Sequence, residues 1–298
     1  MIAAVALLLG QAAAGSSART DQSSPTVVVT GRRPDQAKAV RRMTAKIAPL
    51  GGASKPLARF TAPICPAVDG LPQAMDERFA ARMRSAAAAA GIAVDKPGCL
   101  PNITVLFVPN GQQVVQALHR HRPETFGALE PAQVRRIAAD GGPVHLWSFT
   151  ELKSRDDDRP RQGTTVAGKD APELQVRNAS IIESPTRIVV DGIIVLIDQQ
   201  ASVGKTIDQL ADYTVMRTLA QARPIGSAAA EATILRLFDA GVPAPHGLTD
   251  FDAAYLRAYY RGQATMLPMG KVASMARAIS KSLSQTVTSS EDPPPAGR

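Results

Sequence analysis

The sequence predicts an α+β protein, in which a small mixed sheet is packed by helices and followed by a helical C-terminal half. Short β-rich runs alternate with amphipathic stretches as far as residue 198, a pattern typical of a sheet covered by helices. From Thr206 onward the apolar residues keep helical spacing. The chain has 298 residues, of which 45% are hydrophobic and 20% charged, so it can build a substantial core. No apolar run reaches the roughly 18 to 20 residues of a bilayer-spanning helix.

The N-terminal region predicts export followed by a linker. Residues 1–18 are typical of a signal peptide, because the apolar run at 2–10 precedes the small residues Ala12 and Ala14, which signal peptidase accepts. No Lys or Arg stands before Arg19, so an alanine-rich disordered N-terminus stays open as the alternative. Residues 19–60 are rich in Ser, Arg, Pro and Gly and predict a basic flexible linker. We therefore expect a periplasmic or secreted protein.

The distribution of charge argues against nucleic acid as a partner. The formal net charge is +8, but residues 1–60 hold nine Lys or Arg against two Asp, whereas the rest of the chain holds 25 cations against 24 anions. Neutralising several phosphates requires a continuous positive face on the folded body. A nearly neutral body with a basic leader does not predict one.

Residues 61–283 predict a single α+β domain in which a first helix is followed by a β-α-α-β unit. A stripe of Phe and Met at helical spacing predicts a helix over 73–90. The apolar run 102–108 predicts a buried strand. The Asn110-Gly111 pair then turns the chain into a helix, and Pro131 opens another. Residues 143–150 predict the next strand.

The middle of the chain predicts a mobile loop and a hairpin. Residues 151–176 show no periodicity and carry a run of aspartates, so we expect a mobile loop there. The Asp191-Gly192 pair between two β-rich runs predicts a tight β-hairpin turn.

The pattern of the last third predicts four helices and a tail, the second helix beginning after Ser227 and ending at Gly241. Thr206 with Gln209 and Thr249 with Asp252 match the capping-box pattern that starts a helix. A further apolar stripe defines the last helix, and residues 284–298 predict a disordered tail.

The two cysteines, Cys65 and Cys99, predict a disulfide. Both stand beside Pro or Gly in loops, and an even cysteine count is typical of exported proteins. A bond requires the two Cα atoms to lie within about 7 Å. Zinc would require four ligands with close pairs, and a catalytic cysteine a nearby base. Two buried thiols remain the alternative.

Two common catalytic motifs are incomplete. None of the four histidines, including the strand residue His145, stands four residues from another, so the paired imidazoles of a zinc peptidase are not predicted. The Gly204-Lys205-Thr206 run lacks the earlier glycine of a phosphate-binding loop, because position 199 is Gln199. We expect no metal site and no cofactor.

Asp208 and Asp212 form a candidate functional pair on the helix after Thr206. Two carboxylates one turn apart, beside Tyr213, could bind a hard cation or serve in acid/base catalysis. The helix dipole alone also favours acidic residues in a first turn. Because a buried carboxylate requires a partner, our hypothesis is that Asp212 anchors its helix to the Thr249 helix through Arg257, with Arg217 the other arginine considered.

A family resemblance covers roughly residues 65–279, without the predicted mobile loop. The chain resembles an uncharacterised family of exported alphaproteobacterial proteins through Ile64-Cys65-Pro66, Gly70-Leu71, Cys99-Leu100-Pro101-Asn102, Gln209-Leu210-Ala211-Asp212-Tyr213 and Leu248-Thr249-x-Phe251-Asp252-x-x-Tyr255-Leu256-Arg257-x-x-Tyr260. More distantly, it is similar to a bacterial domain of unknown function related to zinc metallopeptidases. In the second likeness, the helix that would carry the metal ligands holds Asp208, Gln209 and Asp212 here.

These observations favour a non-catalytic envelope protein. We expect a binding or assembly module that recognises another envelope protein or a small ligand, with no nucleic acid bound and no catalytic residue assigned. The alternative from the distant resemblance is a degenerate metallopeptidase-like hydrolase with altered metal ligands.

Overall fold

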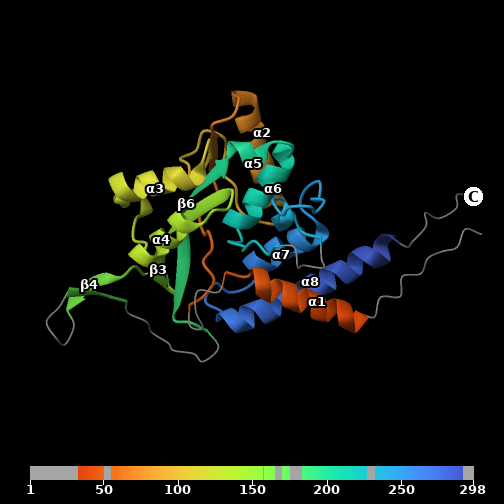
Figure 1. Ribbon diagram of the computed structural model, residues 1–298. Coiled ribbons are helices and arrows are strands. Elements are labelled where there is room, and N and C mark those ends of the chain that lie inside the picture. Colours follow the sequence, from red (N-terminus) through yellow and green to blue (C-terminus); the bar gives the residue numbers. More distant parts are fainter. Residues whose placement is uncertain are drawn as a thin grey trace, which may run out of the picture. The chain divides into compact units, whose positions relative to one another are not determined.

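A computed structural model describes residues 33–49, 55–156, 158–164, 170–174, 183–226 and 232–290. The expected signal peptide, residues 1–18, lies outside these ranges. The fold is a mixed four-stranded sheet with helices on both faces, followed by further helices, so the α+β prediction is confirmed (Figure 1). Among the described residues, no helix has the length and hydropathy of a membrane span.

The sheet has the strand order β1-β2-β6-β3. Its strands are β1 (Pro66–Asp69), β2 (Ile103–Val108), β3 (Val144–Ser154) and β6 (Thr186–Asp198). β1, β2 and β6 run parallel, whereas β3 runs antiparallel to β6. β1 is therefore an outer strand, and only one of its edges is paired within the sheet.

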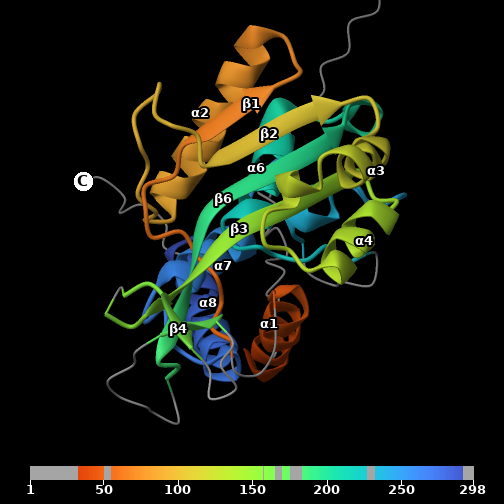
Figure 2. The same ribbon diagram turned by 90° about the vertical axis from the view of Figure 1, so that its left-hand side faces the viewer.

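Helices cover both faces of the sheet (Figure 2). The larger core lies on the face covered by α2 (Gln73–Ala89) and α6 (Ile207–Thr218), with α7 (Asp250–Tyr260) contributing its buried aromatic side chains. A smaller core around Trp147 and Phe126 lies under α3 (Gly111–His121) and α4 (Pro131–Ala139). The remaining elements are α1 (Arg33–Ile47), η1 (Pro123–Phe126), β4 (Arg161–Thr164), β5 (Asp170–Glu173), α5 (Gln199–Ser202), η2 (Ile234–Arg236) and α8 (Pro268–Ser290).

The helix starts follow the expected capping chemistry. Asn110 accepts a hydrogen bond from the backbone N–H of Gln113 and begins α3. Thr206 and Thr249 each form a complete capping box, with Gln209 and Asp252 respectively. These contacts satisfy N–H groups that the first helical turn leaves without a partner, so short local patterns were sufficient to predict them.

The hairpin predicted at Asp191-Gly192 is wrong. β6 runs through this point as one strand, paired with β3 along its length. Phe149 lies opposite Gly192 and Thr150 opposite Val190, which leaves Asp191 as the extra residue of a β-bulge. A long ladder with β3 supplies the hydrogen bonds that a local turn would have supplied.

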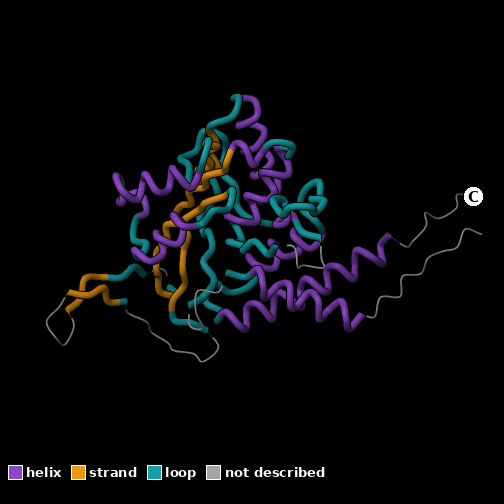
Figure 3. The backbone as a smooth tube through the Cα atoms, in the orientation of Figure 1, coloured by secondary structure: helices purple, strands orange, loops and turns teal. Residues whose placement is uncertain are grey.

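The linker predicted over residues 19–60 is wrong for residues 33–49 and 55–60. Residues 33–47 form α1, which buries Val40, Met43 and Ile47 and lies beside α8 (Figure 3). Farther along, Leu57 and Phe60 are also buried. This segment therefore belongs to the folded body.

Two further boundaries differ from prediction. Within the expected mobile loop 151–176, β3 continues to Ser154, and β4 pairs with β5 as a two-stranded antiparallel sheet. Residues 157, 165–169 and 175–176 of that loop lie outside the described ranges. The tail expected from residue 284 begins as helix, because α8 extends to Ser290.

Candidate functional site

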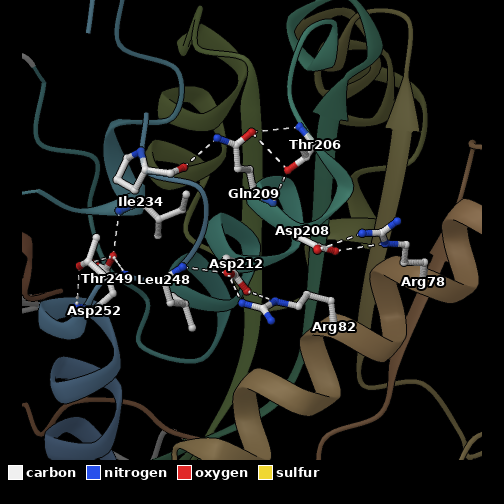
Figure 4. Close-up of polar contacts among 11 residues, drawn as sticks. Arg78, Arg82, Thr206, Asp208, Gln209, Asp212, Ile234, Leu248, Thr249 and Asp252 are labelled. Carbon is white, nitrogen blue, oxygen red and sulfur yellow. Dashed lines mark hydrogen bonds and ion pairs between the residues drawn. The ribbon is translucent and has the colours of Figure 1, made fainter. Parts of the chain in front are cut away.

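The Asp212 carboxylate is a buried structural anchor. It is fully excluded from solvent and accepts hydrogen bonds of 2.8 and 2.6 Å from Nε and Nη2 of Arg82 on α2 (Figure 4). The backbone N–H of Leu248 donates a third, of 2.8 Å. Asp212 thus joins α6 to α2 and to the segment that leads into α7. At Gly247 a Cβ atom would lie 2.7 Å from Oδ2 of Asp212, so a side chain there would collide with the anchor.

The partner predicted for Asp212 is wrong. Arg257 is exposed on α7. Arg217 instead donates a 2.6 Å hydrogen bond to the hydroxyl of Tyr213. The reason is packing: α6 lies directly against α2, and the sequence pattern of either helix alone could not show this contact.

Asp208 forms the equivalent ion pair one turn earlier, at the surface. Nη2 of Arg78 lies 3.0 Å from Oδ2 of Asp208, and the hydrogen-bonded guanidinium group lowers the pKa of the Asp208 carboxyl. The two arginines stand four residues apart on α2, as the two aspartates do on α6, so the helices meet in register. Both carboxylates are therefore engaged by guanidinium groups, which occupy the oxygens that a metal ion or a transferred proton would use.

Tyr213 also has a packing role. Burial raises the pKa of its hydroxyl, which accepts the hydrogen bond from Arg217. Its ring meets Phe238 edge to face, with 4.9 Å between ring centroids. Asp208, Asp212 and Tyr213 thus lie on one helix, but Arg257 does not join them.

His145 is sealed beneath the start of α3. Its side chain is buried, and neither ring nitrogen has a hydrogen-bond partner among the described residues. A Cβ atom at Gly111 would lie 2.6 Å from Cδ2 of His145 and 2.9 Å from Oδ1 of Asp198. Only glycine fits between these side chains, so the imidazole is a packed group without access to solvent.

The disulfide prediction is confirmed. Cys65 and Cys99 are bonded, with their Cα atoms 6.1 Å apart. Cys65 immediately precedes β1, and Cys99 lies in the loop that follows Pro97. The bond therefore holds this loop against the start of the outer strand.

A groove of about 770 Å³ lies between β1 and α2. One face of α2 forms a wall, since its lining residues recur at helical spacing: Gln73, Asp76, Glu77, Ala80, Ala81 and Arg84. β1 forms the opposite wall with Ala67, Val68 and Asp69, and Pro97 closes one end. The alanines leave room in the middle of the groove.

The groove carries opposite charges at its two ends. Asp69, Asp76 and Glu77 lie where β1 ends and α2 begins, whereas Arg84 lies beside the start of β1 and donates to the carbonyl of Pro66 at 3.2 Å. Burial raises the pKa of Asp76, and the charge of Asp69 adds to the rise. Oδ1 of Asp76 and Nε of Arg84 are buried without a partner among the described residues.

The outer edge of β1 has no partner strand in the described sheet, although Ile64, just before β1, exchanges hydrogen bonds with Ala93 and Asp95 on this side. The carbonyl of Cys65 accepts from the N–H of Ile103 on the β2 side, whereas that of Pro66 is taken by Arg84. Backbone groups of successive residues in a strand point to alternate edges. The N–H and C=O of Val68 therefore point away from β2, toward the space beside the groove.

Sequence reasoning missed this groove because it missed β1, which has only four residues. The helical recurrence of Asp76, Ala80 and Arg84 was visible, but it could not indicate a groove without the strand opposite. Among the described residues, no three His, Cys, Asp or Glu side chains gather closely enough to hold a metal ion. No protein-family model, curated protein or solved structure matches the chain.

Proposed function

We propose that the protein is an exported, non-catalytic binding module of the cell envelope, which takes an extended peptide segment of its partner into the groove between β1 and α2. The observation that carries this proposal is the outer edge of β1, whose backbone groups are unpaired at Val68 among the described residues, beside a groove of about 770 Å³. An extended peptide can add to such an edge as a further strand, with backbone hydrogen bonds supplying affinity and the adjoining pocket supplying specificity.

The groove suits side chains that alternate along a bound strand. Ala80 and Ala81 are small, so a side chain of the peptide has room beside α2. The outward N–H and C=O of Val68 offer one pair of backbone hydrogen bonds. The two buried polar atoms without a partner, on Asp76 and Arg84, would gain partners from such a ligand.

The charges favour a basic peptide. Three carboxylates and one guanidinium group line the groove, although the whole chain has a formal net charge of +8. Lys or Arg side chains beside Asp69 and Glu77 would complement this local charge. A periplasmic or secreted location is part of the proposal, and the disulfide supports it, since disulfides persist in oxidising compartments.

Peptide binding tests the proposal directly. The probe is a fluorescent six-residue peptide of alternating Val and Lys with blocked ends, and its comparison is the same peptide with Glu in place of Lys. Fluorescence anisotropy should show preference for the Lys peptide. Ala81→Trp, which fills the groove from an exposed position, should weaken binding at least about tenfold.

Ala88→Trp is the matched control, because Ala88 is exposed on the same helix but does not line the groove. Equal binding by both tryptophan variants, or no preference between the two peptides, would contradict the proposal. Stoichiometric zinc in the purified protein would instead favour the hydrolase alternative, which the paired state of Asp208 and Asp212 disfavours.

A further inference from the structure

The solvent-exposed side of α1 carries four cations. Lys38, Arg41, Arg42 and Lys46 are all exposed, whereas the opposite side of the helix is buried in the core. At 100° per residue the four cations fall within an arc of about 140°, and they span about 12 Å along the axis. Because α1 belongs to the folded body, these charges are displayed on a rigid surface and not on a flexible leader.

Helix α8 lies beside α1 (Figures 1 and 2) and adds two exposed cations to the four of α1. Arg277 and Lys281 are exposed one turn apart on α8. No acidic residue occurs in α8, and Asp35 is the one acidic residue of α1. Among the described residues, none of the six cations forms an ion pair with a carboxylate, so all six are available to an external anion. We call these six residues the α1–α8 basic face.

The apolar side of α1 excludes one common mode of membrane binding. An interfacial amphipathic helix normally inserts its apolar face among the acyl chains. Val40, Met43 and Ile47 are buried in the protein, so α1 can offer only its cations to a membrane. Adsorption of this kind depends on the number of cations and weakens as salt screens them.

We propose that the α1–α8 basic face docks the protein on an anionic phospholipid surface. Disulfides persist in oxidising compartments such as the periplasm, so the Cys65–Cys99 bond supports the exported location that this proposal assumes. Neither helix contains an aromatic residue, so the face lacks the stacking platforms with which proteins bind single-stranded nucleic acids. This site is separate from the groove and does not depend on the peptide proposal.

Vesicle binding by the full chain tests this inference. The probes are vesicles of phosphatidylcholine alone and of phosphatidylcholine mixed with phosphatidylglycerol, and the readout is cosedimentation at low and high salt. We expect binding to the mixed vesicles that salt weakens. Each cation near such a surface contributes about 1 kcal/mol, so the double variant Lys38→Gln/Arg42→Gln should bind about 10- to 30-fold more weakly.

The control is the double variant Arg120→Gln/Arg135→Gln, which removes two exposed cations from α3 and α4. All variants keep the same N-terminal segment, so its contribution cancels, and circular dichroism confirms that each folds. Equal losses in the two double variants, or no preference for phosphatidylglycerol, would overturn the proposal. Tighter binding to duplex DNA than to the vesicles at the same salt, abolished by the α1 variant alone, would assign the face to nucleic acid instead.

Discussion

Asp208 and Asp212 stand one turn apart on α6 and pair with Arg78 and Arg82, which stand one turn apart on α2. The two carboxylates differ in their exposure to solvent. The Arg78–Asp208 pair is exposed to water, whereas the Asp212 carboxylate is completely buried. Water and salt screen the outer pair, so it adds little to stability. The inner carboxylate loses its hydration on folding and depends on Arg82 and on the N–H of Leu248 to replace it.

We expect Asp212→Ala to lower the free energy of unfolding by about 2–4 kcal/mol, because it leaves the guanidinium of Arg82 and the Leu248 N–H without their acceptor. Asp208→Ala should leave the midpoint of chemical denaturation nearly unchanged. Urea titrations followed by circular dichroism measure both. Equal effects of the two substitutions would show that burial does not distinguish the pairs, and the anchor role of Asp212 would then be wrong.

The buried Lys271 should make the free energy of unfolding depend on pH in the alkaline range. Its buried ammonium group donates to the carbonyls of Ala258 and Arg261, and burial lowers its pKa from 10.5 to about 8. Between these values the unfolded chain binds more protons than the folded one, so stability rises with pH in this window. Above about pH 10 the buried tyrosines oppose the trend, because burial raises the pKa of Tyr255 and Tyr260.

The wild-type protein should therefore gain about 1–2 kcal/mol relative to Lys271→Met between pH 7.5 and 9.5. The gain is below the full linkage value because the interval from pH 7.5 to 9.5 covers only part of the range over which the folded and unfolded chains bind different numbers of protons. Guanidinium chloride titrations of both proteins at the two pH values measure the difference. A difference that stays constant, or that falls as the pH rises, would contradict a lowered pKa for Lys271.

Among the helices and strands, the starts of two helices could be predicted from neighbouring residues, whereas the bulge in β6 and the position of α1 depend on tertiary contacts. The capping boxes at Thr206 and Thr249 act within a few residues, so the sequence showed them directly. The bulge at Asp191 and the position of α1 depend on β3 and α8, which lie elsewhere in the chain. α1 was missed because cations dominate its composition and its apolar stripe is short.

The role of α1 in the core leads to a substitution test. Ile47 is fully buried near the end of the helix, so Ile47→Ala should lower the free energy of unfolding by about 2–4 kcal/mol through lost burial and the cavity left behind. Lys46→Ala, at the exposed neighbouring position, should change it by less than about 0.5 kcal/mol. If both variants unfold at the wild-type denaturant concentration, α1 does not pack on the body in solution.

For the whole molecule, the sequence predicted the roles of single residues better than it predicted which segments lie next to each other. It predicted the bond between Cys65 and Cys99, and it offered an anchoring role for Asp212 beside a metal-binding or acid/base role, because both hypotheses start from residue type. It paired Asp212 with Arg257, since nothing in the chain shows that α2 and α6 are neighbours. The groove escaped prediction for the same reason: β1 is recognisable as a strand only through its pairing with β2.

The disulfide links the stability of the whole molecule to the groove. It closes a segment of the chain with a sequence separation of 34, which contains β1 and α2, and the chain-entropy account assigns such a closure about 3–4 kcal/mol. Reduction should therefore lower the thermal midpoint by roughly 6–15 °C in a domain of this size. The double variant Cys65→Ala/Cys99→Ala should show a similar fall that no longer responds to reductant.

Because Pro97 stands two residues before Cys99 and closes one end of the groove, the Lys peptide should also bind the reduced protein more weakly, at a temperature where circular dichroism still reports a folded chain. An unchanged midpoint after complete reduction, verified by thiol titration, would contradict the stabilising role of the bond, and unchanged peptide binding would contradict its role in the groove.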